Sequence, residues 1–313
     1  MIPANAHFIW FGPQFPWVNA LSMRSAAVRG GFERVVLHHS DDLSGTPWWS
    51  WLEETPGFEA RLVNPEDVFA RCGARGAALW ALFEQLEQPA AKANMIRAAI
   101  LYAEGGVYLD LDTVTLRHVD DYRERAQVFC GREHIALPHN VARSRSPRVL
   151  AGAGVRLAVR DAMRRLPGGW RLFRKVDSRY HLAANNAVFA AEPGHAFVDE
   201  LLRGMVEMPR ERQLVRFALG THLLQQTLQA YEGPGVEVHH PEAFYPLPPE
   251  ISEHWFRATR TPALGAVLAA DTRIVHWYAS VRTKRIVPQI DPAYVRRHAR
   301  TQLFSAMALP FVV

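Results

Sequence analysis

The chain has 313 residues, 49% of them hydrophobic, which is enough to form a sizeable folded core and excludes global disorder. Lysine and arginine together number 36 against 31 acidic residues, giving a mildly basic net charge of +5. That balance suits anionic small molecules or an acidic membrane surface, and it is too weak to indicate a nucleic-acid-binding protein.

The two cysteines, Cys72 and Cys130, lie far apart and form no CxxC pair, so neither a disulfide scaffold nor a zinc site is expected. The first residues lack the basic and apolar segments of a signal peptide, and no apolar run approaches the roughly 20 residues needed to cross a bilayer. We therefore expect a cytoplasmic protein, soluble or peripheral at the inner membrane face.

Apolar runs of strand length alternate with helical patterns, which predicts an α/β fold with a mixed, mostly parallel sheet. The elements predicted in the first part of the chain are strands at 8–12, 35–38, 60–68 and 107–116 and helices at 17–28, 76–86 and 90–104. Those predicted in the second part are strands at 186–190, 236–239 and 273–277 and helices at 196–207 and 221–231.

The region from Arg143 to Tyr180 changes character, because it holds eleven basic residues and only two acidic ones, Asp161 and Asp177. We predict a basic helical insertion at 141–182 and a C-terminal tail at 283–313, both within one domain that spans 1–313. A solvated charged face is the simplest interpretation of the insertion. An anionic acceptor or an acidic membrane surface is the alternative.

Two aspartates follow each other closely in the strand predicted at 107–116. Residues i and i+2 of a strand point to one face, so Tyr108, Asp110 and Asp112 are expected to project together while Leu111 faces the core. Two carboxylates this close repel each other unless a cation lies between them. A hard divalent cation, Mg²⁺ or Mn²⁺, would remove the repulsion and accept phosphate oxygens as further ligands.

The segment around these aspartates resembles a known family pattern. Asn94, Arg97, the pair Gly105-Gly106 and the run from Tyr108 to Asp112 are similar to the DXD-containing retaining glycosyltransferases of the sugar-binding-region family. That family includes capsule and lipopolysaccharide enzymes, yeast initiating mannosyltransferases and, more distantly, the large clostridial glucosylating toxins. The resemblance implies a GT-A type, single Rossmann-like nucleotide-binding domain over the whole chain.

The same resemblance implies roles for individual residues. Asp110, Asp112, Arg97 and Asn186 are the implied catalytic set, with Asn185 as the alternative for Asn186 if the register shifts by one. Asp110, Asp112 and His276 are the implied metal ligands. The residues expected to contact the donor are Trp10, which would stack on the base, with Asn94, Arg97, Tyr108, Asp110, Asn185, Ser280 and Lys284.

Three positions depart from the family pattern, and one of them is Thr221, which follows Gly220 where the family often has proline. Asn94 stands where the family usually has aspartate, so it cannot form a charged pair with Arg97, and the identity of the donor sugar is open. Val281 stands where the family usually has tryptophan, in the segment that begins at His276 and includes Ser280. The metal and diphosphate half of the site is therefore better supported than the half that would recognise the sugar.

The expected reaction moves a sugar from a nucleoside-diphosphate donor to an acceptor hydroxyl, and a UDP-sugar is the favoured donor. The acceptor is expected to be a glycan, a lipid-linked molecule or a small molecule. The resemblance implies a retaining hexosyltransferase that uses Mn²⁺ or Mg²⁺ and acts in bacterial polysaccharide synthesis. A toxin-like protein glycosyltransferase and a nucleotide-sugar hydrolase are the alternatives among enzymes. A non-catalytic nucleotide-sugar binder is the alternative of another class, and nucleic acid is not expected as a partner.

Overall fold

The computed structural model describes residues 1–215 and 217–312 of the chain. They divide into two compact units, each made of three chain segments. Unit 1 comprises Met1–Leu111, Thr115–Gly131 and Ala184–His239. Unit 2 comprises Asp112–Val114, Arg132–Ala183 and His240–Val313, of which Val313 lies outside the described residues.

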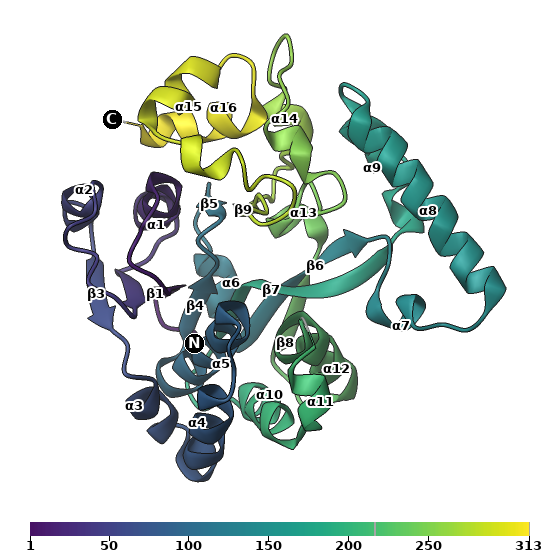
Figure 1. The fold of residues 1–313 in the computed structure, drawn as a ribbon. Helices are drawn as coiled ribbons and strands as arrows, with labels where there is room; N and C mark the ends of the chain where they lie inside the picture. The colour runs from purple at the N-terminus through teal and green to yellow at the C-terminus, as the bar shows by residue number, and fades with distance from the viewer. Residues whose placement is uncertain (216, 313) are drawn as a thin grey trace. The chain divides into compact units, whose positions relative to one another are not determined.

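A seven-stranded sheet has the strand order β3-β2-β1-β4-β7-β6-β8 (Figure 1). The strands of this sheet are β1 (Asn5–Trp10), β2 (Arg34–His39), β3 (Phe58–Leu62), β4 (Gly106–Leu109), β6 (Val128–Ile135), β7 (His181–Ala191) and β8 (Val236–His239). β3, β2, β1 and β4 run parallel to one another, β7 is antiparallel to β4, and β8 is parallel to β6. The predicted α/β class and mixed, mostly parallel sheet are confirmed.

The helices of unit 1 pack around this sheet, and α5, α10 and α4 pack against one another (Figure 1). The α-helices in unit 1 are α1 (Trp17–Arg29), α2 (Trp49–Glu53), α3 (Pro65–Ala70), α4 (Gly76–Glu84), α5 (Pro89–Glu104), α6 (Asp120–Arg125), α10 (Ala196–Glu207), α11 (Arg210–Gln213) and α12 (Leu223–Ala230). A short π-helical segment, η3 (Ala218–His222), precedes α12. Met95, Ile96 and Leu101 of α5 are buried in the same apolar cluster as Phe189 of β7.

Two consecutive glycines turn the chain from α5 into β4. Gly105 has φ +66° and Gly106 has φ +102°, and residues other than glycine rarely adopt such positive φ angles. A Cβ on Gly105 would lie 2.7 Å from Pro193 Cδ, and one on Gly106 would lie 2.7 Å from the Asn5 carbonyl oxygen. The glycine pair therefore permits both the reversal and the close contact of β4 with β1.

The predicted strand at 107–116 is wrong in its extent. β4 ends at Leu109, Asp110 to Asp112 form a turn, and a short β5 (Thr113–Thr115) follows. β5 pairs with β9 (Ile274–His276) in a separate two-stranded sheet. The two aspartates thus follow the sheet strand, and strand alternation does not set their relative direction.

Unit 2 holds the predicted helical region and the C-terminal helices. Its α-helices are α7 (His139–Ala142), α8 (Pro147–Arg165), α9 (Gly169–Arg174), α13 (Pro241–Phe244), α14 (Leu264–Val267), α15 (Pro292–His298) and α16 (Leu303–Ala308). Trp277 and Phe304 are buried and their ring centroids lie 5.1 Å apart, while Phe256 stacks on Phe304 at 4.8 Å. The domain boundaries predicted from the sequence remain predictions.

Among the described residues, none of the helices is both long enough and apolar enough to cross a membrane.

Candidate metal and donor site

Asp110 follows the last residue of β4, and hydrogen bonds within unit 1 hold both its backbone and its carboxylate. Its backbone N–H donates to the Ala187 carbonyl at 2.8 Å, which extends the pairing of β4 with β7 by one residue. Its Oδ1 accepts from the Arg97 guanidinium at 2.7 Å and from the Tyr108 hydroxyl at 2.8 Å. The carboxylate is therefore fixed in direction, although its side chain is 29% exposed.

Arg97 lies within the buried stretch of α5, which runs from Met95 to Leu101. Only 6% of its side chain is exposed. Besides Asp110 it contacts the Asn186 carbonyl, to which it donates at 2.6 Å. Its guanidinium carbon lies 3.9 Å from the centre of the Tyr108 ring. The structure thus places Arg97 as a support for Asp110 and for the Asn186 backbone.

Burial of Tyr108 raises the pKa of its phenol well above the usual value, against the opposing effect of Arg97. The phenol therefore keeps its proton at neutral pH and acts as a hydrogen-bond donor to Asp110.

Asp112 and His276 form a pair within unit 2. Asp112 Oδ1 lies 3.0 Å from His276 Nε2, and Asp112 Oδ2 accepts from the Ala279 N–H at 2.7 Å. Only 17% of the Asp112 side chain and 8% of the His276 side chain are exposed. Burial alone would raise the pKa of Asp112, but His276 and the Ala279 N–H together hold this pKa below its ordinary value, so the carboxylate is ionised.

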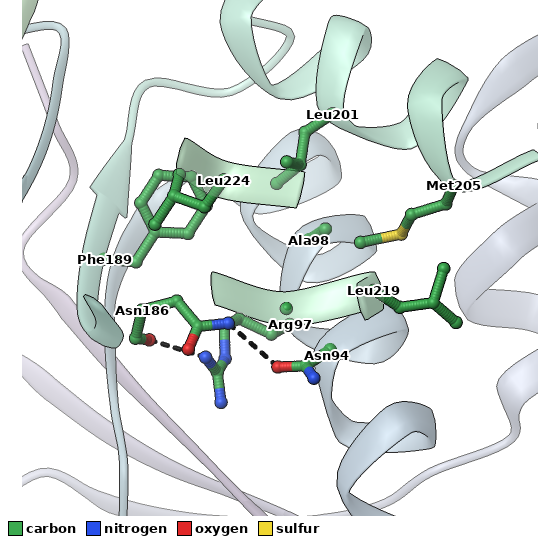
Figure 2. A pocket seen from close by; sticks show the side chains of 10 residues that line it. Asn94, Arg97, Ala98, Asn186, Phe189, Leu201, Met205, Leu219 and Leu224 are labelled. Atoms are coloured by element: carbon green, nitrogen blue, oxygen red, sulfur yellow. Dashed lines mark hydrogen bonds between the residues drawn. The ribbon is translucent and has the colours of Figure 1, made fainter. Parts of the chain in front are cut away.

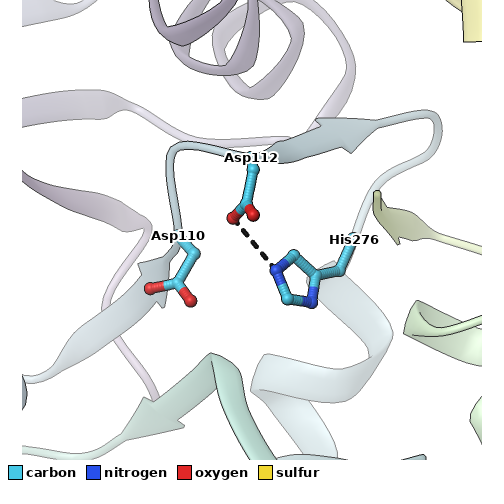
Figure 3. A group of neighbouring side chains, drawn as sticks. All are labelled: Asp110, Asp112 and His276. Carbon is cyan, nitrogen blue, oxygen red and sulfur yellow. Dashed lines mark hydrogen bonds and ion pairs between the residues drawn. The ribbon is translucent and has the colours of Figure 1, made fainter. Parts of the chain in front are cut away.

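Asp110, Asp112 and His276 each offer a ligand atom, and these atoms lie within 4.8 Å of one another (Figure 3). Leu111 alone separates the two aspartates in the chain, so their Cα atoms are at most about 7 Å apart in any conformation. Two carboxylates and one imidazole nitrogen suit Mn²⁺ or Mg²⁺, and the nitrogen ligand suits Mn²⁺ better because Mg²⁺ prefers oxygen. The donor set therefore fits a divalent cation of this kind.

Asn94 and Asn186 meet beside Arg97 in unit 1. Asn186 Nδ2 donates to Asn94 Oδ1 at 2.9 Å, as Figure 2 shows. Both amides line a pocket whose other walls are mostly apolar, with Gly220 of η3 beside Asn94. The other residues that line this pocket are Arg97, Ala98, Phe189, Leu201, Met205, Leu219 and Leu224.

Asn185 has a different environment from its neighbour. It is buried, and its Oδ1 accepts from the Ala187 N–H at 2.7 Å, so its amide oxygen is engaged by the backbone of its own strand. Between the two asparagines named by sequence reasoning, Asn186 is the one that lines the pocket with Asn94 and Arg97.

Trp10 ends β1 and is partly exposed. Its indole Nε1 donates to the Gly12 carbonyl at 2.9 Å, and its ring meets Phe15 edge-on at 5.6 Å. The Gly12 N–H in turn donates to Asp41 Oδ2 at 2.9 Å. The ring is thus held from one side at the carboxyl end of a parallel strand, where ligands bind in open α/β sheets.

Ser280 and Lys284 are exposed residues of unit 2, on the loop that follows β9. Thr283, between them, is buried, and its hydroxyl donates to the Ala279 carbonyl at 2.6 Å. Sequence reasoning missed the Ala279 N–H as a partner of Asp112, because a backbone donor leaves no signal in residue type. Four of the predicted site residues belong to unit 2: Asp112, His276, Ser280 and Lys284. The other predicted site residues belong to unit 1.

Comparison with known proteins identifies the segment that contains the two aspartates. Residues 35–129 match the family described as glycosyltransferase sugar-binding region containing DXD motif. This segment of the chain is similar to that glycosyltransferase family. A comparison with curated proteins found no match.

Several solved structures are similar to this chain. One is described as PaToxG glycosyltransferase, at 16% identity and a TM-score of 0.45, covering 73% of this chain and 69% of that one. Another is the UDP-bound glycosyltransferase domain of the YGT toxin, at 10% identity, a TM-score of 0.42 and coverage of 76% and 79%. A third is mouse xyloside xylosyltransferase 1 in its apo form, at 11% identity, a TM-score of 0.44 and coverage of 88% and 98%.

Proposed function

We propose that this protein is a glycosyltransferase that moves a hexose from a UDP-sugar to an acceptor hydroxyl, with retention of the anomeric configuration and with Mn²⁺ or Mg²⁺ at the aspartates. The observation that carries the proposal is the donor set of Asp110, Asp112 and His276, which begins inside the matched family region. The resemblance of the Gly105 to Asp112 segment to retaining enzymes supports retention, and it favours UDP as the nucleotide.

In the proposed reaction the bond from the anomeric carbon to the diphosphate oxygen breaks, and a bond from the same carbon to the acceptor oxygen forms. The acceptor's proton passes to the departing phosphate oxygen, so no carboxylate is needed as a covalent nucleophile. A bound divalent cation would neutralise the charge that develops on the diphosphate. Asp110, Asp112 and His276 would hold this cation.

The chain's own residues set the geometry around that step. Arg97 and Tyr108 fix the Asp110 carboxylate, and the Ala279 N–H fixes Asp112. The amides of Asn94 and Asn186 offer both donors and acceptors, which suits the hydroxyl groups of a sugar. Trp10 presents a partly exposed indole that can stack on the nucleotide base.

Binding of the donor is tested by thermal shift with a panel of UDP- and GDP-sugars, with and without Mn²⁺. We expect stabilisation by a UDP-sugar that requires the metal and is lost in Asp112→Ala. The exposed Asp271→Ala variant is the matched control and should keep the shift. The proposal is wrong if no nucleotide sugar stabilises the wild-type protein.

Turnover is tested by the release of free UDP with and without candidate acceptors. Release that requires an acceptor and yields an α-linked product from an α-linked donor supports a retaining transferase, whereas a β-linked product contradicts retention. UDP release at the same rate without any acceptor would indicate a hydrolase, and donor binding without release would indicate a binder. A protein acceptor in place of a glycan would indicate a toxin-like enzyme.

A further inference from the structure

Helix α8 of unit 2 turns three of its arginines inward. Arg156, Arg160 and Arg164 recur at every fourth position and so share one helix face. Arg160 contacts Glu250 at 3.0 Å and Arg164 contacts Glu253 at 3.4 Å, and each arginine side chain is only 19% exposed. Arg156 Nε donates to the Ala136 carbonyl at 3.4 Å and the Arg156 carbonyl accepts from the Tyr180 hydroxyl.

The opposite face of α8 is exposed and apolar along its middle. Val155 is 64% exposed, and Ala151, Ala158 and Ala162 are exposed at spacings that place them on the same face. A surface helix of a globular protein normally has its apolar stripe toward the core and its charges toward water. The middle of α8 has the reverse arrangement. Further apolar side chains at least 39% exposed in this region are Val149, Leu150, Leu166, Leu172 and Leu182.

Basic side chains lie on α8, on α9 and in the segments that flank them. Seven of these are exposed and form no ion pair with any residue that the structure describes: Arg143, Arg145, Arg148, Arg165, Arg171, Lys175 and Arg179. Arg148 and Arg165 lie near the two ends of the apolar stripe. Asp161, one of the two acids in this stretch, is already neutralised by Arg160 and Arg164.

We propose that this surface, defined by the exposed face of α8 and the seven basic residues and called here the α8 surface, docks on an acidic lipid bilayer. The basic side chains match anionic headgroups in charge, and the shallow apolar stripe matches the boundary between headgroups and acyl chains.

Other occupants fit the α8 surface less well. A second copy of the chain, docked across a two-fold axis, would bring the same unpaired positive charges together. A single-stranded nucleic acid would need aromatic rings on which bases stack, but Trp170, Phe173 and Tyr180 are at most 6% exposed. The choice of an acidic bilayer does not depend on the proposed reaction.

The test is sedimentation of the full chain with vesicles of phosphatidylcholine alone and of phosphatidylcholine with about 30% phosphatidylglycerol, without any nucleotide sugar. In about 0.1 M NaCl we expect binding to the acidic vesicles only, and we expect its loss when the salt is raised severalfold. Each basic residue near an acidic leaflet contributes about fivefold to partition, so Arg148→Ala with Arg165→Ala should weaken binding roughly 25-fold. The paired control is Arg210→Ala with Arg212→Ala on α11 of unit 1, both exposed, which should bind like wild type.

The apolar stripe is tested by Val155→Asp, which should weaken binding about tenfold or more because it places a charge in the membrane-facing position. Val28→Asp, at another half-exposed valine in α1, is the control and should change binding little. Equal sedimentation with neutral and acidic vesicles, or unchanged binding by Val155→Asp, overturns the proposal. A dimer that dissociates on Val155→Asp, seen by light scattering without lipid, would assign the surface to a second copy instead.

Discussion

Arg97 is the residue on which the order of the Asp110 carboxylate depends. Its side chain is almost entirely buried and joins α5 to Asp110 and to the backbone of β7. The fork of the guanidinium serves two acceptors at once, which a lysine ammonium cannot do with the same geometry. We therefore regard Arg97 as a positioning residue for Asp110.

Replacing Arg97 by alanine should lower the free energy of unfolding by about 2–3 kcal/mol, because it removes one of the two side-chain donors to Asp110 Oδ1 and the guanidinium donor to the Asn186 carbonyl. Arg97→Lys should recover part of this loss. Urea unfolding followed by circular dichroism measures both. The control is Arg203→Ala, whose ion pairs with Glu200 and Glu207 are exposed and should cost less than about 1 kcal/mol. Equal losses for Arg97 and Arg203 would contradict this role.

The motif and the family resemblance together predict that the two aspartates and an imidazole gather in one place. Asp110, Asp112 and His276 were named together from the motif and the resemblance, and the structure brings their ligand atoms within 4.8 Å. The sequence could not show that Arg97 would bind Asp110, because the pattern implied a sugar contact for it. Nor could it separate Asn185 from Asn186, since that choice depends on which amide faces α5.

Among the secondary-structure elements, strands β1 and β2 are joined by a pair of buried histidines. His7 Nε2 lies 3.0 Å from the Gly105 carbonyl, and His7 Nδ1 lies 3.0 Å from His38 Nε2. Burial lowers the pKa of His7 to about 4, although Glu104 nearby acts in the opposite direction and Arg61 and Arg34 lower it further. Burial also lowers the pKa of His38 well below its usual value, and His7 adds to this effect.

Stability should therefore fall as the pH drops below 6.5. In that range the unfolded histidines bind protons and the folded ones do not, down to about pH 4 for His7. The expected slope approaches roughly 1.4 kcal/mol per pH unit for each histidine. Urea unfolding at pH 7, 6 and 5 measures it. His38→Gln keeps a donor toward His7 and should reduce the slope, while His240→Gln, at an exposed position, should not. A slope equal in all three proteins would contradict the prediction.

The π-helical segment η3 packs closely against α5. A Cβ on Gly220 would lie 2.6 Å from Asn94 Nδ2, so Gly220→Ala should destabilise the protein by about 1–3 kcal/mol through overpacking. Asn94→Ala removes the opposing amide, and the double variant should therefore be more stable than the sum of the two changes predicts, by about 1 kcal/mol. Thermal unfolding of the three variants tests this.

The matched control for Gly220 is Gly265→Ala on α14, where a Cβ would meet nothing within 4 Å. Its unfolding temperature should stay near that of the wild-type protein. Additive losses in the Gly220 and Asn94 variants would show that the crowding is not between these two residues.

Long elements with strong periodicity were predictable, and short ones beside the site were not. The helix at 90–104 and the strand at 236–239 correspond closely to α5 and β8, because apolar spacing and the glycine stop fix them. The strand at 107–116 was predicted too long because its alternating residues continue through the turn at Asp110–Asp112. Pairing of β5 with β9 joins residues more than 150 positions apart, and no local pattern encodes it.

At the scale of the molecule, the two units are interleaved along the chain. Each consists of three segments, so the chain passes from one unit to the other five times. Neither unit can therefore be cut out as a continuous fragment. In unit 2, for example, Arg160 and Arg164 come from the segment before residue 184, whereas their partners Glu250 and Glu253 come from the segment after residue 239.

A chain that ends at His239 should lose cooperative unfolding. It would keep Arg160 and Arg164 without Glu250 and Glu253, and it would lack Trp277, which is fully buried in unit 2. Circular dichroism during a urea titration should show a broad, non-cooperative transition. A sharp transition with wild-type slope would contradict this expectation.

The histidine pair also provides an internal spectroscopic reporter. The Gly105 carbonyl can only accept, so neutral His7 carries its proton on Nε2, and its Nδ1 must then accept from His38 Nε2. Both rings are thereby fixed as the same tautomer. Their imidazole protons are buried, so they should exchange slowly with solvent and give resolved nitrogen-bound resonances in NMR spectra. Loss of these two signals would report opening between β1 and β2 before any global unfolding.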